Sequence, residues 1–280
     1  MVHPLLDLAP AFHAGRRTAV TSVCSAHPVV IEATLRHGMA TSQPVLIEAT
    51  CNHVNQDGGY TRMTPAGFRK FVFSIAGRVG YPTNLIIFGG DHLGPNPWKD
   101  LPAAEAMAKA EAMIAAFSAA GFTKLHLDTS MGCLGEPVAL ADTVTADRAA
   151  RLAAVAEAHR QGGLAPVYII GTEVRVPGGA VDGLDHLQIT RPEALATTYR
   201  IHEAAFANAG QSDAFSRVIG LVVQPGVEFG HDDVIHYMPE KARDLSAALA
   251  DLPASSSKPT PPTTRLKTAS GTWSRTDSRS

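Results

Sequence analysis

An aspartate and a histidine follow one another where a buried strand is expected to end. The run Leu85–Phe88 is short, apolar and contains adjacent isoleucines, which is typical of a strand buried on both faces. Gly89 and Gly90 come next and allow a sharp turn and the close approach of another group. In Asp91 and His92 a carboxylate that can transfer a proton then stands beside an imidazole that can bind a metal. The alternative is structural: the aspartate caps the next turn and the histidine hydrogen-bonds the backbone.

Polar side chains recur at the ends of the other predicted strands, which favours a functional role for the pair. They are Ser25, His27, Glu48, Asp128, Glu173 and Gln224. The loop after Glu48 adds further hydrogen-bonding side chains, and its alternative interpretation is a turn rich in such residues. Ligands of parallel α/β folds bind at the carboxyl ends of the strands. We therefore expect one end of the sheet to gather the following candidate residues: Glu48, Asn52, Gln56, Asp57, Asp91, His92, Asp128, Glu173 and Gln224.

Six strand–helix units position these residues. Strands are predicted at residues 18–25, 43–50, 85–88, 124–130, 166–173 and 217–226. Helices are predicted at residues 1–15, 28–37, 65–79, 103–120, 145–161, 190–209 and 236–250. The units are roughly 35–45 residues apart, a spacing typical of repeated strand–helix pairs. A barrel is favoured over a doubly wound open sheet, because the chain has no GxGxxG turn and no P-loop motif.

Composition excludes several classes of function. The chain has 280 residues, of which 45% are hydrophobic and 18% charged, as in an ordinary globular protein. A net charge of -2 gives no electrostatic footprint for nucleic acid or an anionic membrane. No apolar run reaches transmembrane length and the N-terminus has no secretory segment, so we expect a cytoplasmic protein. The three cysteines, which have no CxxC spacing, are expected to be buried thiols rather than reactive nucleophiles.

Five segments of the chain resemble the GatZ/KbaZ family, in the same order and spacing. They are residues 48–60, 89–98, 126–131, 171–179 and 224–230, and the resemblance extends from residue 1 to about residue 252. Members of this family are the accessory subunits of class II D-tagatose-1,6-bisphosphate aldolase. The resemblance implies an α/β fold, the (β/α)8 TIM barrel of class II aldolases. It also implies a role in the catabolism of tagatose 6-phosphate, galactitol or N-acetylgalactosamine.

The resemblance further implies a partner, which is the catalytic class II aldolase subunit that the accessory subunit stabilises and activates. A sugar bisphosphate is the implied ligand, and an oligomer the implied state. Two alternatives stay open: a metal-dependent ketose aldolase or 4-epimerase that acts by itself, and a sugar-phosphate-binding protein without catalysis. Members are often labelled tagatose-6-phosphate kinase, and the missing P-loop does not support that activity.

Class II aldolases bind a divalent metal such as Zn²⁺ through histidines, one of which follows an aspartate after a barrel strand. By this resemblance His92 is a metal ligand and Asp91 is the catalytic group that transfers a proton. His126 is a candidate second ligand. The remaining candidates at the strand ends are assigned to substrate binding: Glu48, Asn52, Gln56, Asp57, Asp128, Glu173 and Gln224.

Residues 253–280 form a different kind of sequence, rich in serine, threonine and proline and without helical or strand periodicity. Six strands precede them, whereas a barrel has eight. The family continues here with a seventh strand similar to Leu-Val-Phe-Glu-Ala-His-Ser-Thr-Asp-Tyr-Gln-Thr. Codons for residues 255–266 can encode that strand in another reading frame. In that frame the first two bases of each present codon become the last two bases of a new codon.

We therefore predict an incomplete barrel domain over residues 1–252, with about six strand–helix units, and a disordered tail that arises from a frameshift over residues 253–280. An incomplete barrel leaves its first and sixth strands with unpaired edges and opens its interior to water. On this basis the chain is expected to be unstable and inactive alone.

Overall fold

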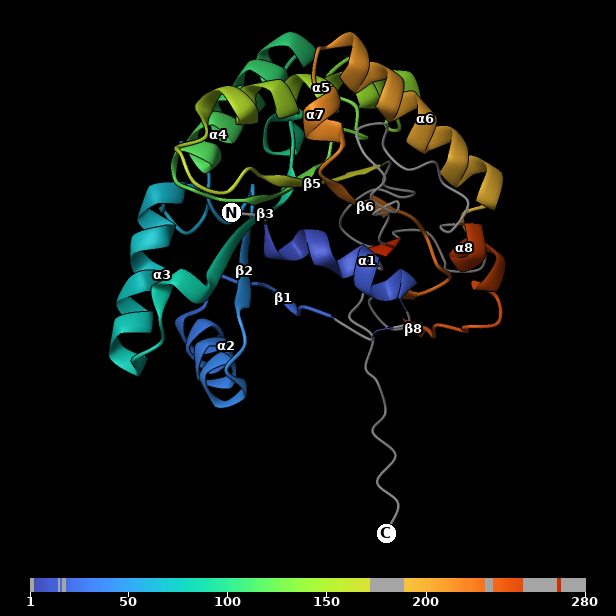
Figure 1. The fold of residues 1–280 in the computed structure, drawn as a ribbon. Helices are drawn as coiled ribbons and strands as arrows, with labels where there is room; N and C mark the ends of the chain where they lie inside the picture. Colours follow the sequence, from blue (N-terminus) through green and yellow to red (C-terminus); the bar gives the residue numbers. More distant parts are fainter. Residues whose placement is uncertain are drawn as a thin grey trace.

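The computed structural model describes residues 3–14, 16, 19–171, 189–229, 234–248 and 266–267. Six parallel strands lie side by side in chain order. They are β1 (Ser22–Cys24), β2 (Val45–Thr50), β3 (Ile86–Leu93), β4 (Lys124–Leu127), β5 (Val167–Gly171) and β6 (Val218–Val222). Figure 1 shows the long helices outside the curved sheet and helix α1 on its inner side. The fold is thus an α/β barrel of parallel strands that is partial rather than closed, which confirms the predicted fold class.

A short strand of the tail continues this sheet. Strand β9 (Leu266–Lys267) pairs in parallel with Leu221 and Val222 of β6. The expectation of an unpaired edge at the sixth strand is therefore wrong for these residues, because β9 offers hydrogen-bond partners to backbone groups that would otherwise face solvent. Residues 249–265 and 268–280 lie outside the described residues, so the disordered tail stays a prediction. A separate hairpin joins β7 (Glu228–Phe229) and β8 (Val234–Ile235).

The helices mostly follow the predicted ranges. They are η1 (Pro4–Asp7), α1 (Leu8–His13), α2 (Pro28–Thr41), α3 (Pro65–Val79), η2 (Thr83–Leu85), η3 (Asn96–Trp98), α4 (Ala103–Ala119), α5 (Asp142–His159), α6 (Pro192–Asn208), α7 (Ser212–Phe215) and α8 (Arg243–Ala248). Helix α3 begins after Thr64, whose hydroxyl accepts a hydrogen bond from the Gly67 amide, and ends at Gly80 with a φ of 75°.

Three helices differ from the sequence prediction at one end. Helix α8 begins at Arg243 rather than at residue 236, since Pro239 disfavours a helical conformation in the residue before it. Helix α2 does not end at Gly38 but continues to Thr41, and Ser42 takes the left-handed cap conformation. Gly38 serves packing instead, because a Cβ at this position would collide with Val45. Helix α5 begins at Asp142 rather than after Thr145, which is fully buried inside the helix. None of the helices in the described part of the chain combines the length and the hydropathy needed to cross a bilayer.

Successive side chains of a strand point to opposite sides of the sheet. Residues of one parity, such as Ile47, Phe88 and Leu125, pack against the surrounding helices. Residues of the other parity face the interior of the barrel and meet the N-terminal segment in a second cluster. We call this cluster the apolar layer; it consists of Leu5, Leu8, Leu46, Ile87, Val167, Ile169 and Ile219.

His3 anchors the N-terminal segment to the barrel. Its Nδ1 accepts a hydrogen bond of 3.1 Å from the Leu5 amide, so the proton of the neutral ring is on Nε2. Nε2 in turn lies 3.1 Å from the Thr123 hydroxyl, just before β4. Burial and then the charge of Arg217 lower the pKa of His3 to about 4, which keeps the ring neutral in the folded chain at pH 7.

Candidate metal centre

Asp91 and His92 turn toward the same site because β3 carries a bulge. Between Gly90 and Leu93 the pairing with β4 shifts register, so that three steps along β3 face two along β4. His92 accommodates the extra residue with a φ of 49°, in the left-handed region that histidine seldom adopts. In a regular strand two adjacent side chains point to opposite faces of the sheet. The bulge therefore creates the site from two neighbouring residues.

The predicted sharp turn at Gly89 and Gly90 is wrong, because β3 runs through both glycines to Leu93. Their missing side chains leave room for neighbours, as expected. A Cβ at Gly89 would collide with the carboxylate of Glu48 on β2, and one at Gly90 would collide with the side chain of Leu93. The glycines thus permit close packing at the site rather than a change of chain direction.

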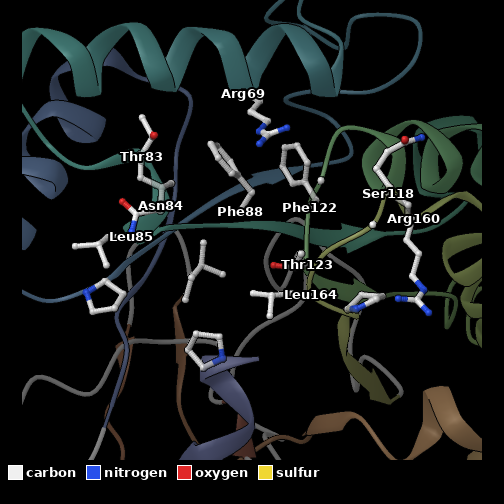
Figure 2. A pocket seen from close by; sticks show the side chains of 18 of the residues that line it. Arg69, Thr83, Asn84, Leu85, Phe88, Ser118, Phe122, Thr123, Arg160 and Leu164 are labelled. Carbon is white, nitrogen blue, oxygen red and sulfur yellow. The ribbon is translucent and has the colours of Figure 1, made fainter. Parts of the chain in front are cut away.

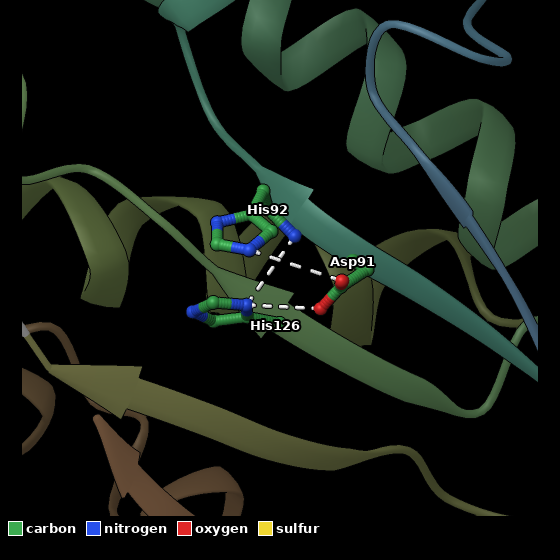
Figure 3. Close-up of side chains that lie close together, drawn as sticks. All are labelled: Asp91, His92 and His126. Carbon is green, nitrogen blue, oxygen red and sulfur yellow. Dashed lines mark hydrogen bonds and ion pairs between the residues drawn. The ribbon is translucent and has the colours of Figure 1, made fainter. Parts of the chain in front are cut away.

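Asp91, His92 and His126 form one cluster (Figure 3), in which ligand atoms of all three residues lie within 4.8 Å of one another. The Asp91 Oδ2 atom is 3.8 Å from His92 Nε2, and its Oδ1 atom is 3.1 Å from His126 Nδ1. His126 is almost fully buried, whereas the His92 side chain is 37% exposed. Two imidazoles and a carboxylate are ligands that suit Zn²⁺ and similar divalent ions.

Asp128 orients His92. Its Oδ2 atom lies 3.0 Å from His92 Nδ1, and its Oδ1 atom accepts a hydrogen bond of 3.1 Å from Ser130. Burial raises the pKa of Asp128, but hydrogen bonds and positive charge from His92 and His126 outweigh burial, so the net pKa is lowered. A charged Asp128 fixes the proton of a neutral His92 ring on Nδ1 and leaves the Nε2 lone pair for a metal.

A buried ion pair lies beneath the cluster. Lys124 Nζ is 2.5 Å from Glu48 Oε1 and 3.6 Å from Asp91 Oδ1. The Lys124 and Glu48 side chains are only 3% and 1% exposed. Ser22 on β1 donates a hydrogen bond to the other oxygen of Glu48. We call Glu48, Asp91, His92, Lys124, His126 and Asp128 the charged layer; its three carboxylates face a single ammonium group, which leaves room for a bound cation.

The loop after β2 does not join the charged layer through the contacts of its predicted residues. Gln56 donates a hydrogen bond to the Lys109 carbonyl on α4, and Asp57 pairs with the Lys109 ammonium at 3.5 Å. Asn52 is exposed. Their predicted role in substrate binding stays a prediction.

Two predicted residues lie farther along the chain. Gln224 follows β6 and is buried, and its side-chain oxygen accepts hydrogen bonds from the backbone amides of Gly226 and Val227. Gln224 therefore shapes its own loop at the carboxyl end of the sheet. Glu173 lies outside the described residues.

Sequence reasoning missed Lys124, Ser22 and Ser130. A signal for Lys124 was present, because it precedes His126 by two residues and therefore lies on the same face of β4. The two serines had no comparable signal, since each depends on a hydrogen bond to a carboxylate that the sequence pattern does not specify.

None of the three cysteines forms a disulfide, and Cys51 and Cys133 are buried, as expected, whereas Cys24 is only partly buried. Cys51 ends β2 close to the charged layer. Burial and the charges of Asp128 and Asp91 raise the pKa of its thiol to about 12. A thiol with so high a pKa is a poor nucleophile.

One cavity in the described part of the chain lies away from the cluster. It has a volume of about 550 Å³ and is lined at the starts of β3 and β4 by Thr83, Asn84, Phe88, Phe122 and Thr123 (Figure 2). Asp91 and His92 lie at the other end of β3. Because ligands of parallel barrels bind at the carboxyl ends of the strands, we assign the chemistry to the cluster and not to this cavity.

Comparison with known proteins adds a family. The sequence profile of the D-tagatose-1,6-bisphosphate aldolase subunit GatZ/KbaZ-like family matches residues 5–256. The chain is 56% identical over 247 residues to the D-tagatose 6-phosphate 4-epimerase of Agrobacterium fabrum. It is 51% identical over 249 residues to the D-tagatose-1,6-bisphosphate aldolase subunit GatZ of Klebsiella pneumoniae. Each alignment covers 88% of this chain, and the chain spans 58% and 59% of the lengths of these relatives.

A solved structure agrees with these relatives. The chain resembles a probable tagatose 6 phosphate kinase from Sinorhizobium meliloti 1021, with a TM-score of 0.75 and 59% sequence identity. This similarity covers 84% of the chain and 56% of that protein. The match of the family profile to nearly all of residues 1–256, together with the two relatives above 50% identity, identifies the chain as a member of the GatZ/KbaZ-like family.

Proposed function

We propose that this chain is the barrel portion of a subunit of class II D-tagatose-1,6-bisphosphate aldolase. That enzyme converts tagatose 1,6-bisphosphate to glycerone phosphate and glyceraldehyde 3-phosphate. The subunit stabilises and activates a catalytic class II partner. The observation that carries the proposal is the cluster of Asp91, His92 and His126 at the carboxyl ends of β3 and β4, in a chain of the GatZ/KbaZ-like family.

The cluster suits a divalent metal such as Zn²⁺. Its ligand atoms are close enough to share one ion, and the carboxylates of the charged layer outnumber its ammonium group. His92, His126 and Asp91 are the residues that would hold the metal. A bound metal would polarise the substrate carbonyl and so favour cleavage of the bond between carbons 3 and 4.

The protein residues supply orientation and proton transfer. Asp128 holds the His92 ring at Nδ1 and so directs Nε2 toward Asp91. Asp91 would contribute Oδ1 to the metal site, and its Oδ2 atom would take the proton from the hydroxyl on carbon 4 during cleavage and return it during condensation. His126 and Lys124 hold the other oxygen of Asp91.

A second candidate function is 4-epimerisation of tagatose 6-phosphate by this chain acting alone. The relative from Agrobacterium fabrum, whose name states this activity, favours it. Cleavage between carbons 3 and 4, followed by rejoining on the other face of the aldehyde, would invert carbon 4 with the same residues. A sugar-phosphate-binding protein without catalysis is the remaining alternative.

Activity assays separate the three functions. The purified chain is incubated with tagatose 1,6-bisphosphate, alone and with a catalytic class II subunit, and triose phosphate release is measured. We expect the chain to raise the rate or lifetime of the catalytic subunit, and Asp91→Asn to reduce any turnover that the chain performs itself. Conversion of tagatose 6-phosphate to its 4-epimer by the chain alone would favour the second function. Sugar-phosphate binding without any effect on turnover would leave only the third.

A further inference from the structure

We propose that the Lys124 ammonium group competes with a bound metal for the Asp91 carboxylate and so lowers the metal affinity. Glu48 offsets this effect and raises the affinity. The proposal rests on the metal site proposed above. Lys124 Nζ is 3.6 Å from Asp91 Oδ1, one of the three cluster residues, and 2.5 Å from Glu48 Oε1. The positive charge of Lys124 thus lies beside a carboxylate that a metal ion would also need.

Gly89 makes this arrangement possible. On the sheet Gly89 pairs with Glu48 on one side and with Lys124 on the other, so the three residues lie at one level. A Cβ at Gly89 would collide with the Glu48 carboxylate. The Glu48 side chain on β2 therefore passes over Gly89 of β3 to reach Lys124 on β4.

The ion pair is held in place from both sides. Ser22 donates a hydrogen bond to one oxygen of Glu48, and Lys124 meets the other. Asp91 is divided in the same way: Oδ1 faces Lys124 and His126, whereas Oδ2 faces His92. Neither partner of the pair can turn to solvent, because both side chains are at least 97% buried.

Fixed charges at this depth are weakly screened and act strongly on a divalent ion. Lys124 repels the ion and occupies one oxygen of Asp91, which weakens binding. Glu48 attracts the ion and also draws Lys124 away from Asp91, which strengthens binding. The two residues therefore act on metal affinity in opposite directions, and in the native chain their effects largely cancel.

Zinc binding tests this directly. The 280-residue chain and its variants are stripped of metal and titrated with Zn²⁺ by calorimetry. We expect Lys124→Met to bind Zn²⁺ at least about tenfold more tightly and Glu48→Gln at least about tenfold more weakly. The double variant should return to within about threefold of the native affinity, since the two charges are removed together. Lys109→Met, which removes an exposed ammonium paired with Asp57, is the matched control and should not change the affinity.

The outcomes are distinct. A purely structural ion pair would lower the affinity in both single variants, and that result would overturn the proposal, as would unchanged affinity in folded single variants. If circular dichroism shows that Lys124→Met does not fold, the other two variants still test the proposal. It then requires a lower zinc affinity in Glu48→Gln and recovery of that affinity in the double variant. Absence of zinc binding in every form, the native chain included, would overturn the metal site itself and this inference with it.

Discussion

The interior of the barrel has two layers, and strands β2 and β3 contribute to both. The apolar layer comes from β2, β3, β5, β6 and the N-terminal segment. The charged layer comes from β2, β3 and β4 with the residue that follows β4, and it contains three carboxylates, two imidazoles and one ammonium group. On β2 the change takes two residues, from Leu46 to Glu48. The apolar layer stabilises the fold, whereas the charged layer lies where parallel barrels place their ligands.

This division has consequences for mutation. A change in the apolar layer should reduce stability and leave metal affinity intact in the molecules that remain folded. A change in the charged layer should alter metal affinity in a direction set by charge. A change that disturbs a backbone contact between two elements at the strand ends should alter both stability and metal affinity.

The largest effect is expected at Gly94, where the chain leaves β3. A Cβ there would overlap the carbonyl oxygen of Asp128, which is backbone and cannot move aside. Gly94→Ala should lower the free energy of unfolding by more than about 4 kcal/mol and displace Asp128 from His92. Gly77→Ala is the control, since a Cβ at that helical position meets nothing within 4 Å. Urea denaturation of both variants checks the prediction, and native stability in Gly94→Ala would contradict it.

Leu5→Ala should have the next largest effect. Leu5 is 2% exposed and packs in the apolar layer. Its truncation should lower the free energy of unfolding by about 3–5 kcal/mol through lost burial and a new cavity. The Zn²⁺ affinity of the folded variant should stay within about twofold of the native value, because Leu5 belongs to the apolar cluster and is not one of the three ligand residues. A large loss of affinity in folded Leu5→Ala would show that the layers are coupled.

The buried ring of His3 should make the stability of the chain sensitive to acid. Its pKa is lowered from 6.5 to about 4 in the folded chain, so the unfolded chain binds more protons between these values. Stability from this group is complete above pH 6.5 and is lost as the pH falls toward 4, by about 3 kcal/mol. The loss of stability between pH 7 and pH 4.5 should be smaller in His3→Gln, measured by urea denaturation. An equal loss in both proteins would count against a buried neutral ring.

The smallest effect is expected at Asp57, outside both layers. Its partner Lys109 lies 3.5 Å away, and both side chains are about half exposed. Asp57→Ala should change the free energy of unfolding by less than about 0.5 kcal/mol. Zinc affinity should not change, which calorimetry can check. A clear loss of affinity would place the β2–α3 loop nearer to the metal than its contacts indicate.

Much of the fold could be predicted from the sequence, because it depends on local patterns. The buried run Val45–Thr50 and the capped helix Pro65–Val79 occur within a residue or two of their predicted ranges. These elements are determined by apolar periodicity, proline and glycine placement and side-chain caps, all of which are local.

The geometry of the site could be predicted only in part, because it depends on register between strands. The bulge at Asp91 and His92 exists only against β4, and the pairing of Glu48 with Lys124 exists only across Gly89. A single strand pattern carries no information on either. The contacts of Gln56 and Asp57 with Lys109 on helix α4 likewise depend on packing between elements, which a sequence pattern does not specify.

The metal centre is tested most directly by substitution of His92. Purified native chain should bind about one Zn²⁺ ion, as the three ligand residues of a single site predict. His92→Ala should abolish this binding and keep the native circular dichroism spectrum, because its side chain is 37% exposed and fills no core position. His37→Ala, which removes an exposed histidine on α2, should bind as the native chain does. Native zinc affinity in folded His92→Ala would contradict the proposed site.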